Sequence, residues 1–175
     1  MLTIPTASGK SLIAHLTIVH RLTNDLKGQK AVYVVPLKAL AQEKMNELRE
    51  ITAHTDLKVG LAIGDRESER SSIENSDIMV CTSEKLDSLI RTRSGIMDKI
   101  GIVITDEFHL INDPGRGPTL EIVLSRIRHR KPDVQIIALS ATVGNSEELA
   151  NWLDAKLIKS TWRPVSLEYG ILNGL

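Results

Sequence analysis

The sequence predicts an α/β fold in which a mostly parallel sheet is covered by helices on both faces. Short β-branched runs alternate with longer amphipathic stretches along the 175 residues, which is the pattern of strand–helix–strand units. Most of the short runs are apolar without clean alternation, as is typical of strands that are buried on both faces. No internal repeat, low-complexity segment or linker interrupts this pattern before Trp162.

Five short runs are predicted strands, and five longer stretches are predicted helices. The strands are residues 30–35, 58–63, 77–82, 101–105 and 134–139; the helices are residues 10–26, 37–51, 83–92, 119–130 and 147–153. Apolar residues in 37–51 recur at steps of three and four, which predicts one buried stripe. We expect Gly117 and Pro118 to be the N-cap and first residue of a helix, and Asn145 with Glu148 to form a capping box.

The start of the chain predicts its domain organisation. A phosphate-binding loop normally follows a buried strand, yet almost no strand precedes the glycine-rich residues 5–11. We therefore expect a piece of a longer protein, with one domain over residues 1–162 and a connector toward a second domain over residues 163–175. A sheet that lacks this first strand is the alternative.

The composition excludes several classes of function. The chain is 42% hydrophobic and 25% charged, which is enough apolar material for a core. The formal net charge is +0 and aromatic residues make up 3%, so neither bulk positive charge nor a base-stacking platform is expected. The single cysteine, Cys81, and the lack of an apolar run of membrane-spanning length predict a cytoplasmic protein without membrane contact.

Residues 5–11 read PTASGKS and match the later part of a phosphate-binding loop. Gly9 allows backbone N–H groups to approach phosphate oxygens, the Lys10 ammonium suits the β- and γ-phosphates, and the Ser11 hydroxyl can ligate Mg²⁺. The following helix adds its positive end to this anion site. Ile4 stands where the usual pattern has its first glycine, so a chance G-K-S at a helix start is the alternative.

A second cluster, which we call the acidic cluster, consists of Asp106, Glu107 and His109 directly after the predicted strand 101–105. Its aspartate can hold Mg²⁺ through water, and its glutamate can orient and deprotonate the water that attacks a γ-phosphate. His109 can sense that phosphate through its switchable charge. Two carboxylates that only cap the next helix are the alternative, but the GKS loop in the same chain favours a nucleoside triphosphatase.

Further candidate residues lie after other predicted strands. Ser140 and Thr142 can hydrogen-bond the acidic cluster and relay the nucleotide state, with a simple strand-end turn as the alternative. Residues 36–39 (PLKA) and 82–85 (TSEK) open helices whose N–H groups and hydroxyls suit phosphodiester oxygens, and each is equally well an ordinary N-cap. Arg116 follows the acidic cluster and either touches a nucleic-acid backbone or is solvated.

Other side chains are expected to be structural. The five histidines lie at no metal-ligand spacing, so a zinc site is not expected. Cys81 and Trp152 are expected in the core, and Trp162 could be a hinge anchor. A basic group on one helix is expected to be a solvated face, and its members are Arg126, Arg128, His129, Arg130 and Lys131.

Six motifs carry a family resemblance: PTASGKS, PLKALAQEK, TSEKLDSLI, DEFHLI, GRGPTLE and SATVGN. In this order they resemble the first RecA-like domain of superfamily 2 DExH-box helicases of the Ski-like group. Residues 106–121, 151–153 and 162–165 are most similar to archaeal fork-repair DNA helicases of the HelQ-related type. The resemblance implies a RecA-like P-loop NTPase that moves 3′ to 5′ on single-stranded or forked DNA, with a second RecA-like domain and accessory domains.

The resemblance also assigns roles to residues. ATP would be bound by Thr6, Ala7, Ser8, Gly9, Lys10 and Ser11. Mg²⁺ would be held by Ser11 and Asp106, with Glu107 as the general base and Lys10 and Asp106 as further catalytic residues. Hydrolysis would be coupled to movement by His109, Ser140 and Thr142. The path of the nucleic-acid strand would be lined by Pro36, Leu37, Lys38, Thr82, Ser83 and Lys85.

Two alternatives to a DNA helicase stay open. An RNA helicase of the same group would carry the same backbone-tracking motifs. A non-hydrolysing, ATP-gated adaptor would bind nucleic acid without turnover, although Glu107 beside Asp106 argues against it. We expect these 175 residues alone to hydrolyse ATP poorly and to unwind nothing, because the arginine finger would come from the second domain.

Overall fold

A computed structural model describes residues 1–5, 8–64, 72–92 and 95–163. In these residues seven strands form one sheet in the order β3-β4-β2-β5-β6-β1-β7. The strands are β1 (Leu2–Thr3), β2 (Lys30–Val35), β3 (Val59–Ala62), β4 (Ile78–Thr82), β5 (Ile100–Thr105), β6 (Gln135–Ser140) and β7 (Ile158–Lys159). All of these strand pairs are parallel, so the predicted α/β class is confirmed.

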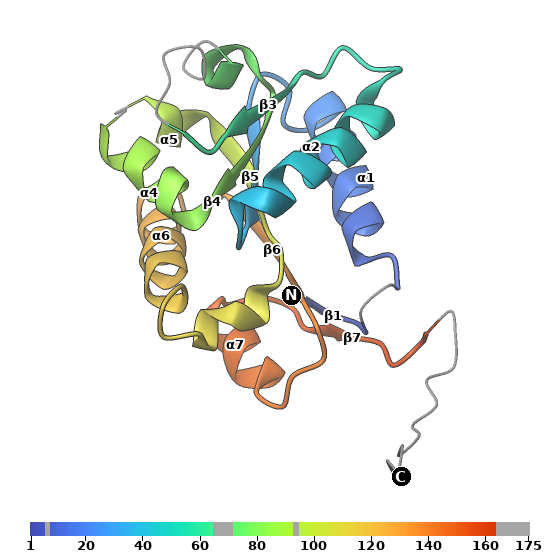
Figure 1. Ribbon diagram of the computed structural model, residues 1–175, viewed down its shortest axis with the longest axis vertical. Helices are drawn as coiled ribbons and strands as arrows, with labels where there is room; N and C mark the ends of the chain where they lie inside the picture. Colours follow the sequence, from blue (N-terminus) through green and yellow to red (C-terminus); the bar gives the residue numbers. More distant parts are fainter. Residues whose placement is uncertain (6–7, 65–71, 93–94, 164–175) are drawn as a thin grey trace, which may run out of the picture.

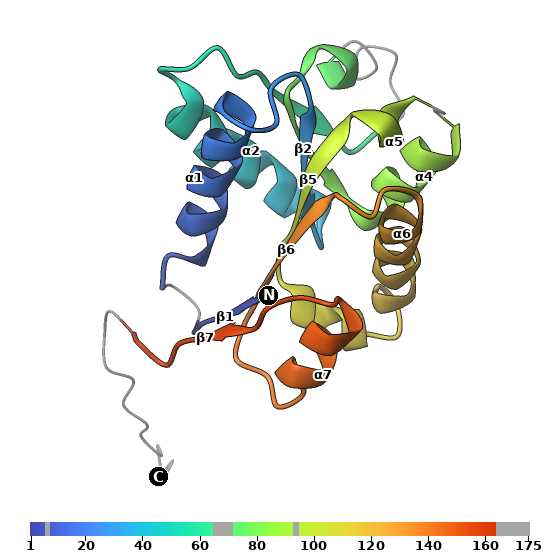
Figure 2. The same cartoon turned by 180° about the vertical axis from the view of Figure 1, so that it is seen from behind.

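Helices cover both faces of the sheet (Figures 1 and 2). One face carries α1 (Lys10–Thr23) and α2 (Lys38–Thr52). The other carries α4 (Ser83–Thr92), α5 (Ile96–Lys99), the 3-10 helix η1 (Phe108–Asn112), α6 (Gly117–Arg130) and α7 (Ser146–Trp152). Among the described helices, none has the length and apolar character needed to cross a membrane.

The central strands β2, β4 and β5 divide the interior into two cores. Along β2, Val32 and Val34 belong to the core beneath α4 and α6, whereas Ala31, Tyr33 and Val35 belong to the core beneath α1 and α2. Successive side chains of a strand point to opposite faces, and both faces of these strands are buried. This is why the strand runs are apolar without alternation. The expected core positions of Cys81 and Trp152 are also found, since Cys81 is fully buried and Trp152 packs against the core.

The strand before the glycine-rich loop is present but very short. Leu2 and Thr3 pair with Leu139 and Ser140 of β6 on one side and with Ile158 and Lys159 of β7 on the other. The sequence pattern predicted neither β1 nor β7, because two residues carry no periodicity. The pairing nevertheless places the loop at the carboxyl edge of the sheet, beside the end of β6.

Two expectations about helix starts need correction. Asn145 is the N-cap of α7, but its side chain makes no capping hydrogen bond, so the predicted capping box is not formed. Asn145 Oδ1 instead accepts a 3.5 Å hydrogen bond from Asn112 Nδ2. Helix α6 begins at Gly117 with Arg116 as its N-cap, one residue earlier than predicted, and Asp113 Oδ1 accepts the N–H of Arg116 at 3.0 Å.

The prediction of a solvated basic face on α6 is wrong for three of its five residues. Arg126 Nη1 donates to Asp87 Oδ1 of α4 at 2.6 Å, and Arg128 Nη1 donates to the carbonyl of Trp152 at 2.6 Å. Lys131 Nζ donates to the carbonyl of Asp98 at 2.8 Å. These cations therefore join α6 to its neighbours, while His129 and Arg130 are exposed as expected.

Replacing Gly117 by alanine is expected to destabilise the fold. A Cβ at this position would lie 1.9 Å from the carbonyl oxygen of Ile111, so the backbone of η1 and α6 would have to separate. We expect the free energy of unfolding to fall by about 1–3 kcal/mol, the usual cost of overpacking, in urea denaturation. Gly144→Ala is the matched control, because its Cβ would meet nothing within 4 Å. Equal losses in both variants would contradict this packing.

Candidate functional site

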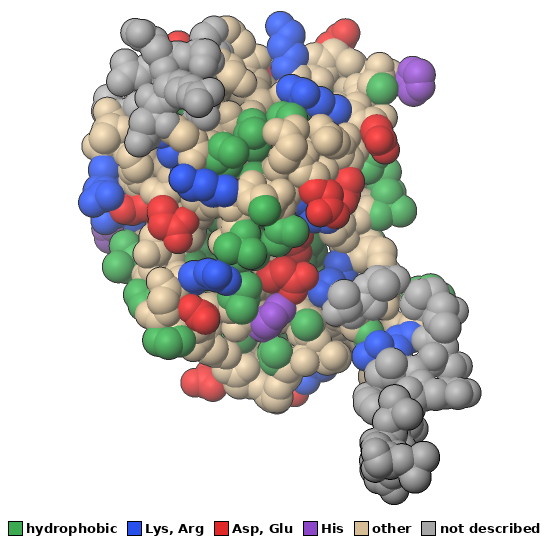
Figure 3. Space-filling view, in the orientation of Figure 1, with side chains coloured by type: hydrophobic (Ala, Val, Ile, Leu, Met, Phe, Trp, Pro, Cys, Tyr) green, Lys and Arg blue, Asp and Glu red, His purple; other side chains and the backbone are tan. Residues whose placement is uncertain are grey.

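The predicted motif residues meet at the carboxyl edge of the sheet. The N–H of Ile4, at the end of β1, donates to the carbonyl of Ser140 at 3.3 Å, so the glycine-rich loop starts beside β6. A small cleft at the same edge is lined by Val34, Val35, Pro36, Ser83, Thr105, Asp106, Glu107, Leu110, Arg116 and Leu120. Figure 3 shows acidic side chains beside a histidine on this part of the surface, over η1.

The described part of the glycine-rich loop has the features of an anion site. Gly9 is the N-cap of α1 with φ 81°, a left-handed conformation that glycine adopts without strain. Lys10 follows as the first residue of the helix, is only 7% exposed, and its Nζ has no hydrogen-bond partner among the described residues. A buried ammonium without a partner is costly, so an anionic ligand would satisfy it. Thr6 and Ala7 lie outside the described residues.

The hydroxyl of Tyr33 joins the loop to the acidic cluster. Tyr33, on β2, donates to Asp106 Oδ2 at 3.0 Å within the interior. Burial, and then the negative charge of Asp106, raise the pKa of Tyr33, while a side-chain hydrogen bond with Ser11 lowers it. The phenol therefore stays protonated and donates to the carboxylate. Of the two predicted metal ligands, Asp106 accepts the hydrogen bond of this hydroxyl, and Ser11 lies close enough to influence the pKa of Tyr33.

The acidic cluster turns sharply after Asp106. Glu107 has φ 47° and ψ 44°, a left-handed conformation that costs a non-glycine residue energy. Its N–H donates to Asp106 Oδ1 at 2.9 Å, and its Oε2 lies 3.4 Å from His109 Nδ1. The turn thus separates two roles: Asp106 faces Tyr33 and is 8% exposed, whereas the Glu107 side chain is 32% exposed beside His109.

Two predicted coupling residues, Ser140 at the end of β6 and Thr142 just beyond it, make no side-chain hydrogen bond to the acidic cluster in the described structure. Ser140 is fully buried at the end of β6, but its hydroxyl donates to the carbonyl of Ala141 at 2.8 Å. Thr142 is exposed. The predicted hydrogen bond from this segment to the acidic cluster is therefore not seen, because the Ser140 hydroxyl donates instead to the backbone carbonyl of Ala141, the next residue.

The two predicted strand-tracking segments differ in how their helices begin. Leu37 is the N-cap of α2 and makes no side-chain cap, and both Leu37 and Lys38 are exposed after a half-buried Pro36. The first N–H groups of α2 thus have no side-chain cap, and such N–H groups can bind phosphate oxygens.

The start of α4 is already satisfied within the chain. Thr82 Oγ1 accepts the N–H of Lys85 at 3.4 Å, and Lys85 Nζ donates to the carbonyl of Gly64. Thr82 and Ser83 are both buried. The ordinary N-cap that the sequence left open is therefore realised at Thr82. Arg116, by contrast, is half-buried and lines the small cleft with Asp106 and Glu107.

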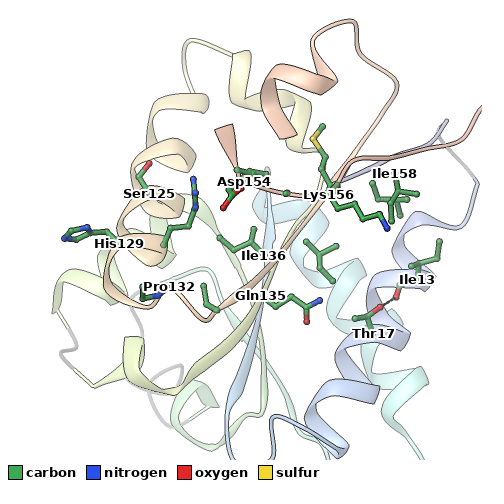
Figure 4. A pocket seen from close by; sticks show the side chains of 17 residues that line it. Ile13, Thr17, Ser125, His129, Pro132, Gln135, Ile136, Asp154, Lys156 and Ile158 are labelled. Atoms are coloured by element: carbon green, nitrogen blue, oxygen red, sulfur yellow. Dashed lines mark hydrogen bonds between the residues drawn. The ribbon is translucent and has the colours of Figure 1, made fainter. Parts of the chain in front are cut away.

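A larger cavity of about 840 Å³ lies elsewhere, and no predicted site residue lines it. Figure 4 shows it between α1, β6 and α6, with Ile13 and Thr17 on one side, Gln135 and Ile136 along the strand, and His129 on the other side. Neither the carboxylates of the acidic cluster nor the glycine-rich loop lines it, so the motif residues at the carboxyl edge remain the candidate site.

The model of the family described as DEAD/DEAH box helicase matches residues 1–149. The chain belongs to this helicase family. The solved DUF1998 helicase MrfA bound to DNA is similar to this helicase domain, with a TM-score of 0.77 and 25% sequence identity over 91% of this chain and 25% of that one. The RecA-like helicase fold predicted from six motifs is thereby confirmed.

Several curated relatives are archaeal helicases called ATP-dependent DNA helicase Hel308. Those of Methanocella arvoryzae, Pyrococcus horikoshii and Thermoplasma acidophilum are 45%, 49% and 47% identical to this helicase domain over 98% of its length. The chain spans 23–25% of these proteins, about a quarter of their length. The predicted likeness to archaeal DNA helicases is therefore confirmed.

The residues of this edge fit a magnesium-bound nucleotide. The buried ammonium of Lys10, which has no hydrogen-bond partner in the part of the chain that the structure describes, matches phosphate oxygens. The Ser11 hydroxyl and Asp106 carboxylate are oxygen ligands of the kind Mg²⁺ prefers. Sequence reasoning missed Tyr33, and it missed Lys44, whose Nζ donates to Ser11 Oγ at 3.2 Å. Tyr33 gives one available signal: a tyrosine in an otherwise aliphatic strand needs a buried partner for its hydroxyl.

Tyr33→Phe is expected to destabilise the helicase domain. The variant leaves one oxygen of the Asp106 carboxylate without its phenol donor, and a hydrogen bond to a charged group contributes about 1.5–3 kcal/mol. Urea denaturation should show a loss of this size. Thr105→Val is the control, because the Thr105 hydroxyl is buried without a partner in the described structure and its removal should cost nothing. A Tyr33→Phe protein as stable as the wild type would contradict the assigned bond.

Proposed function

We propose that this chain is the ATP-hydrolysing motor domain of an ATP-dependent 3′–5′ DNA helicase that acts on single-stranded or forked DNA in repair. The observation that carries the proposal is the hydrogen bond from Tyr33 to Asp106, close enough to Ser11 for that residue to lower the pKa of Tyr33. At the start of the same helix as Ser11, the buried Lys10 ammonium has no hydrogen-bond partner among the described residues. The Hel308 relatives support the choice of DNA as substrate.

In this proposal the chain's own residues bind and orient the nucleotide. Gly9 and the first N–H groups of α1 face the phosphates, and Lys10 neutralises their charge. Ser11 and Asp106 would hold Mg²⁺, directly or through water, and the bound ion supplies charge stabilisation to the phosphates during transfer. Tyr33 donates a hydrogen bond to Asp106 Oδ2, and the N–H of Glu107 donates one to Asp106 Oδ1. Together the two bonds orient the Asp106 carboxylate.

Glu107 is the proposed general base. Its side chain is partly exposed at the cleft, while the backbone turn keeps it apart from the buried Asp106. A carboxylate in this place can orient a water molecule and accept its proton. His109, 3.4 Å from Glu107 Oε2, is placed to respond to the charge of the bound nucleotide; together with Ser140 and Thr142 it is proposed to couple hydrolysis to movement.

The proposed DNA path runs along the starts of α2 and α4. The exposed start of α2, with Pro36, Leu37 and Lys38, offers uncapped N–H groups to the strand backbone, and Thr82, Ser83, Lys85 and Arg116 extend the path. In a protein built like its relatives, residues 1–162 would form one motor domain, residues 163–175 would connect it to a second RecA-like domain, and accessory domains would follow. We infer a cytoplasmic location.

Lys10→Ala and Glu107→Gln are expected to separate binding from turnover. Lys10→Ala should abolish binding of an ATP analogue with little change in unfolding free energy, because its ammonium has no hydrogen-bond partner among the described residues. Glu107→Gln should bind ATP normally but lose at least about a hundredfold in turnover, the usual contribution of a general base. Equilibrium binding to this chain and ATPase assays of the whole helicase measure the two effects. Unchanged turnover in Glu107→Gln would favour the adaptor.

DNA should stimulate the ATPase of the whole helicase more than RNA of equal length. Contacts to the backbone of a nucleic-acid strand distinguish DNA from RNA only weakly. Comparing stimulation by DNA with stimulation by RNA therefore tests the proposed DNA substrate, which the Hel308 relatives support. This chain alone should unwind nothing and hydrolyse ATP slowly, since an arginine finger contributes about a thousandfold or more. Equal or stronger stimulation by RNA would replace the DNA assignment with that of an RNA helicase.

A further inference from the structure

Lys44 reaches from α2 to the hydroxyl that is proposed to ligate the metal. Its Nζ donates to Ser11 Oγ at 3.2 Å and to Glu47 Oε1 and Oε2 at 3.0 Å each. The Lys44 side chain is only 14% exposed, whereas that of Glu47 is 35% exposed. A largely buried ammonium is therefore held between one hydroxyl and one carboxylate.

Glu47 also faces the interior. Its Oε2 lies 3.9 Å from Nε2 of His15, which is buried on α1. His15 in turn packs against Tyr33, with ring centroids 5.4 Å apart. The Lys44–Glu47 pair thus belongs to the same group of side chains as the Tyr33 hydroxyl, on the face of the sheet that α1 and α2 cover.

The contact with Ser11 conflicts with metal binding. A serine that ligates Mg²⁺ offers an oxygen lone pair to the ion, and an ammonium that donates to the same oxygen brings a second positive charge to it. Two cations on one oxygen repel each other. The lysine side chain is flexible, and the Glu47 carboxylate already accepts its ammonium.

We propose that Lys44 is a positioning residue that holds the Ser11 hydroxyl while the metal site is empty and moves wholly onto Glu47 when Ser11 ligates Mg²⁺. This inference rests on the proposed function, which makes Ser11 a metal ligand. Lys44 thus opposes metal binding, and Glu47 relieves that opposition. A purely structural Lys44, which only ties α2 to α1, would have no such effect on the metal.

The test measures Mg²⁺ dependence rather than turnover. A fluorescent, non-hydrolysable ATP analogue is bound to this chain at a series of MgCl₂ concentrations, and the half-saturating Mg²⁺ concentration is recorded. Lys44→Met should lower it at least about threefold, because a unit charge acts on a nearby dication even at an effective dielectric constant of about 20. Lys44→Gln should do the same and replaces Lys44→Met if the methionine variant does not fold.

Glu47→Gln completes a double-mutant cycle. Alone it should raise the half-saturating Mg²⁺ concentration at least about threefold, because the Lys44 ammonium loses its alternative partner. In the Lys44→Met background it should change nothing. If the effect of Glu47→Gln persists in that background, Glu47 acts on the metal directly and the proposal is wrong. A half-saturating concentration that Lys44→Met leaves unchanged or raises also overturns it.

Two controls separate this inference from the proposed function. Lys27→Met removes one positive charge from an exposed residue beyond the end of α1 and should leave the Mg²⁺ dependence unchanged. Lys10→Ala should abolish analogue binding. If it does and Lys44→Met has no effect, the motor assignment stands and the role of Lys44 is wrong. If the wild-type chain shows no Mg²⁺-dependent binding, both are wrong.

Discussion

The hydroxyl of Tyr33 is buried between two layers of the domain, and the geometry of the site depends on the bond it makes there. A buried tyrosine hydroxyl needs a hydrogen-bond partner, and this one finds the carboxylate of Asp106. Because β2 pairs with β5 and packs beneath α1 and α2, this hydroxyl lies beside Asp106 and close enough to Ser11 for that residue to influence the pKa of Tyr33. The phenol thereby ties β2 to the acidic cluster on the side of the sheet that α1 and α2 cover.

Two lysines at this site differ in how their charge is balanced. Lys10 is buried with no hydrogen-bond partner in the described structure, so it gains most from an anionic ligand. Lys44 is held by Ser11 and Glu47, so its charge is balanced before any ligand arrives. The strained turn at Glu107 adds a third feature, because it separates the buried aspartate from the accessible glutamate. In the proposed function, binding and turnover thus use different parts of one edge.

The strands and helices with strong periodicity were predicted within a few residues, because burial of both sheet faces imposes long apolar runs. β1, β7, α5 and η1 were not predicted, since elements of two to five residues depend on the neighbours they pack against. The basic group on α6 was misread for the same reason. Arg126 and Arg128 are polar residues on a helix surface, and only the packing of α4 and α7 gives them partners.

The sequence by itself determined the fold class and the helicase family, and it predicted the residues proposed to face the phosphates, because these depend on residue types at fixed spacing within single segments. Only the tertiary structure decided that Tyr33 donates to Asp106, and that Lys44 donates to both Ser11 and Glu47. The residues next to Tyr33 in its apolar strand, and to Lys44 in its amphipathic helix, do not show which side chains these two residues will contact. Their partners come from other elements, which meet them only when the sheet assembles and the helices pack on it.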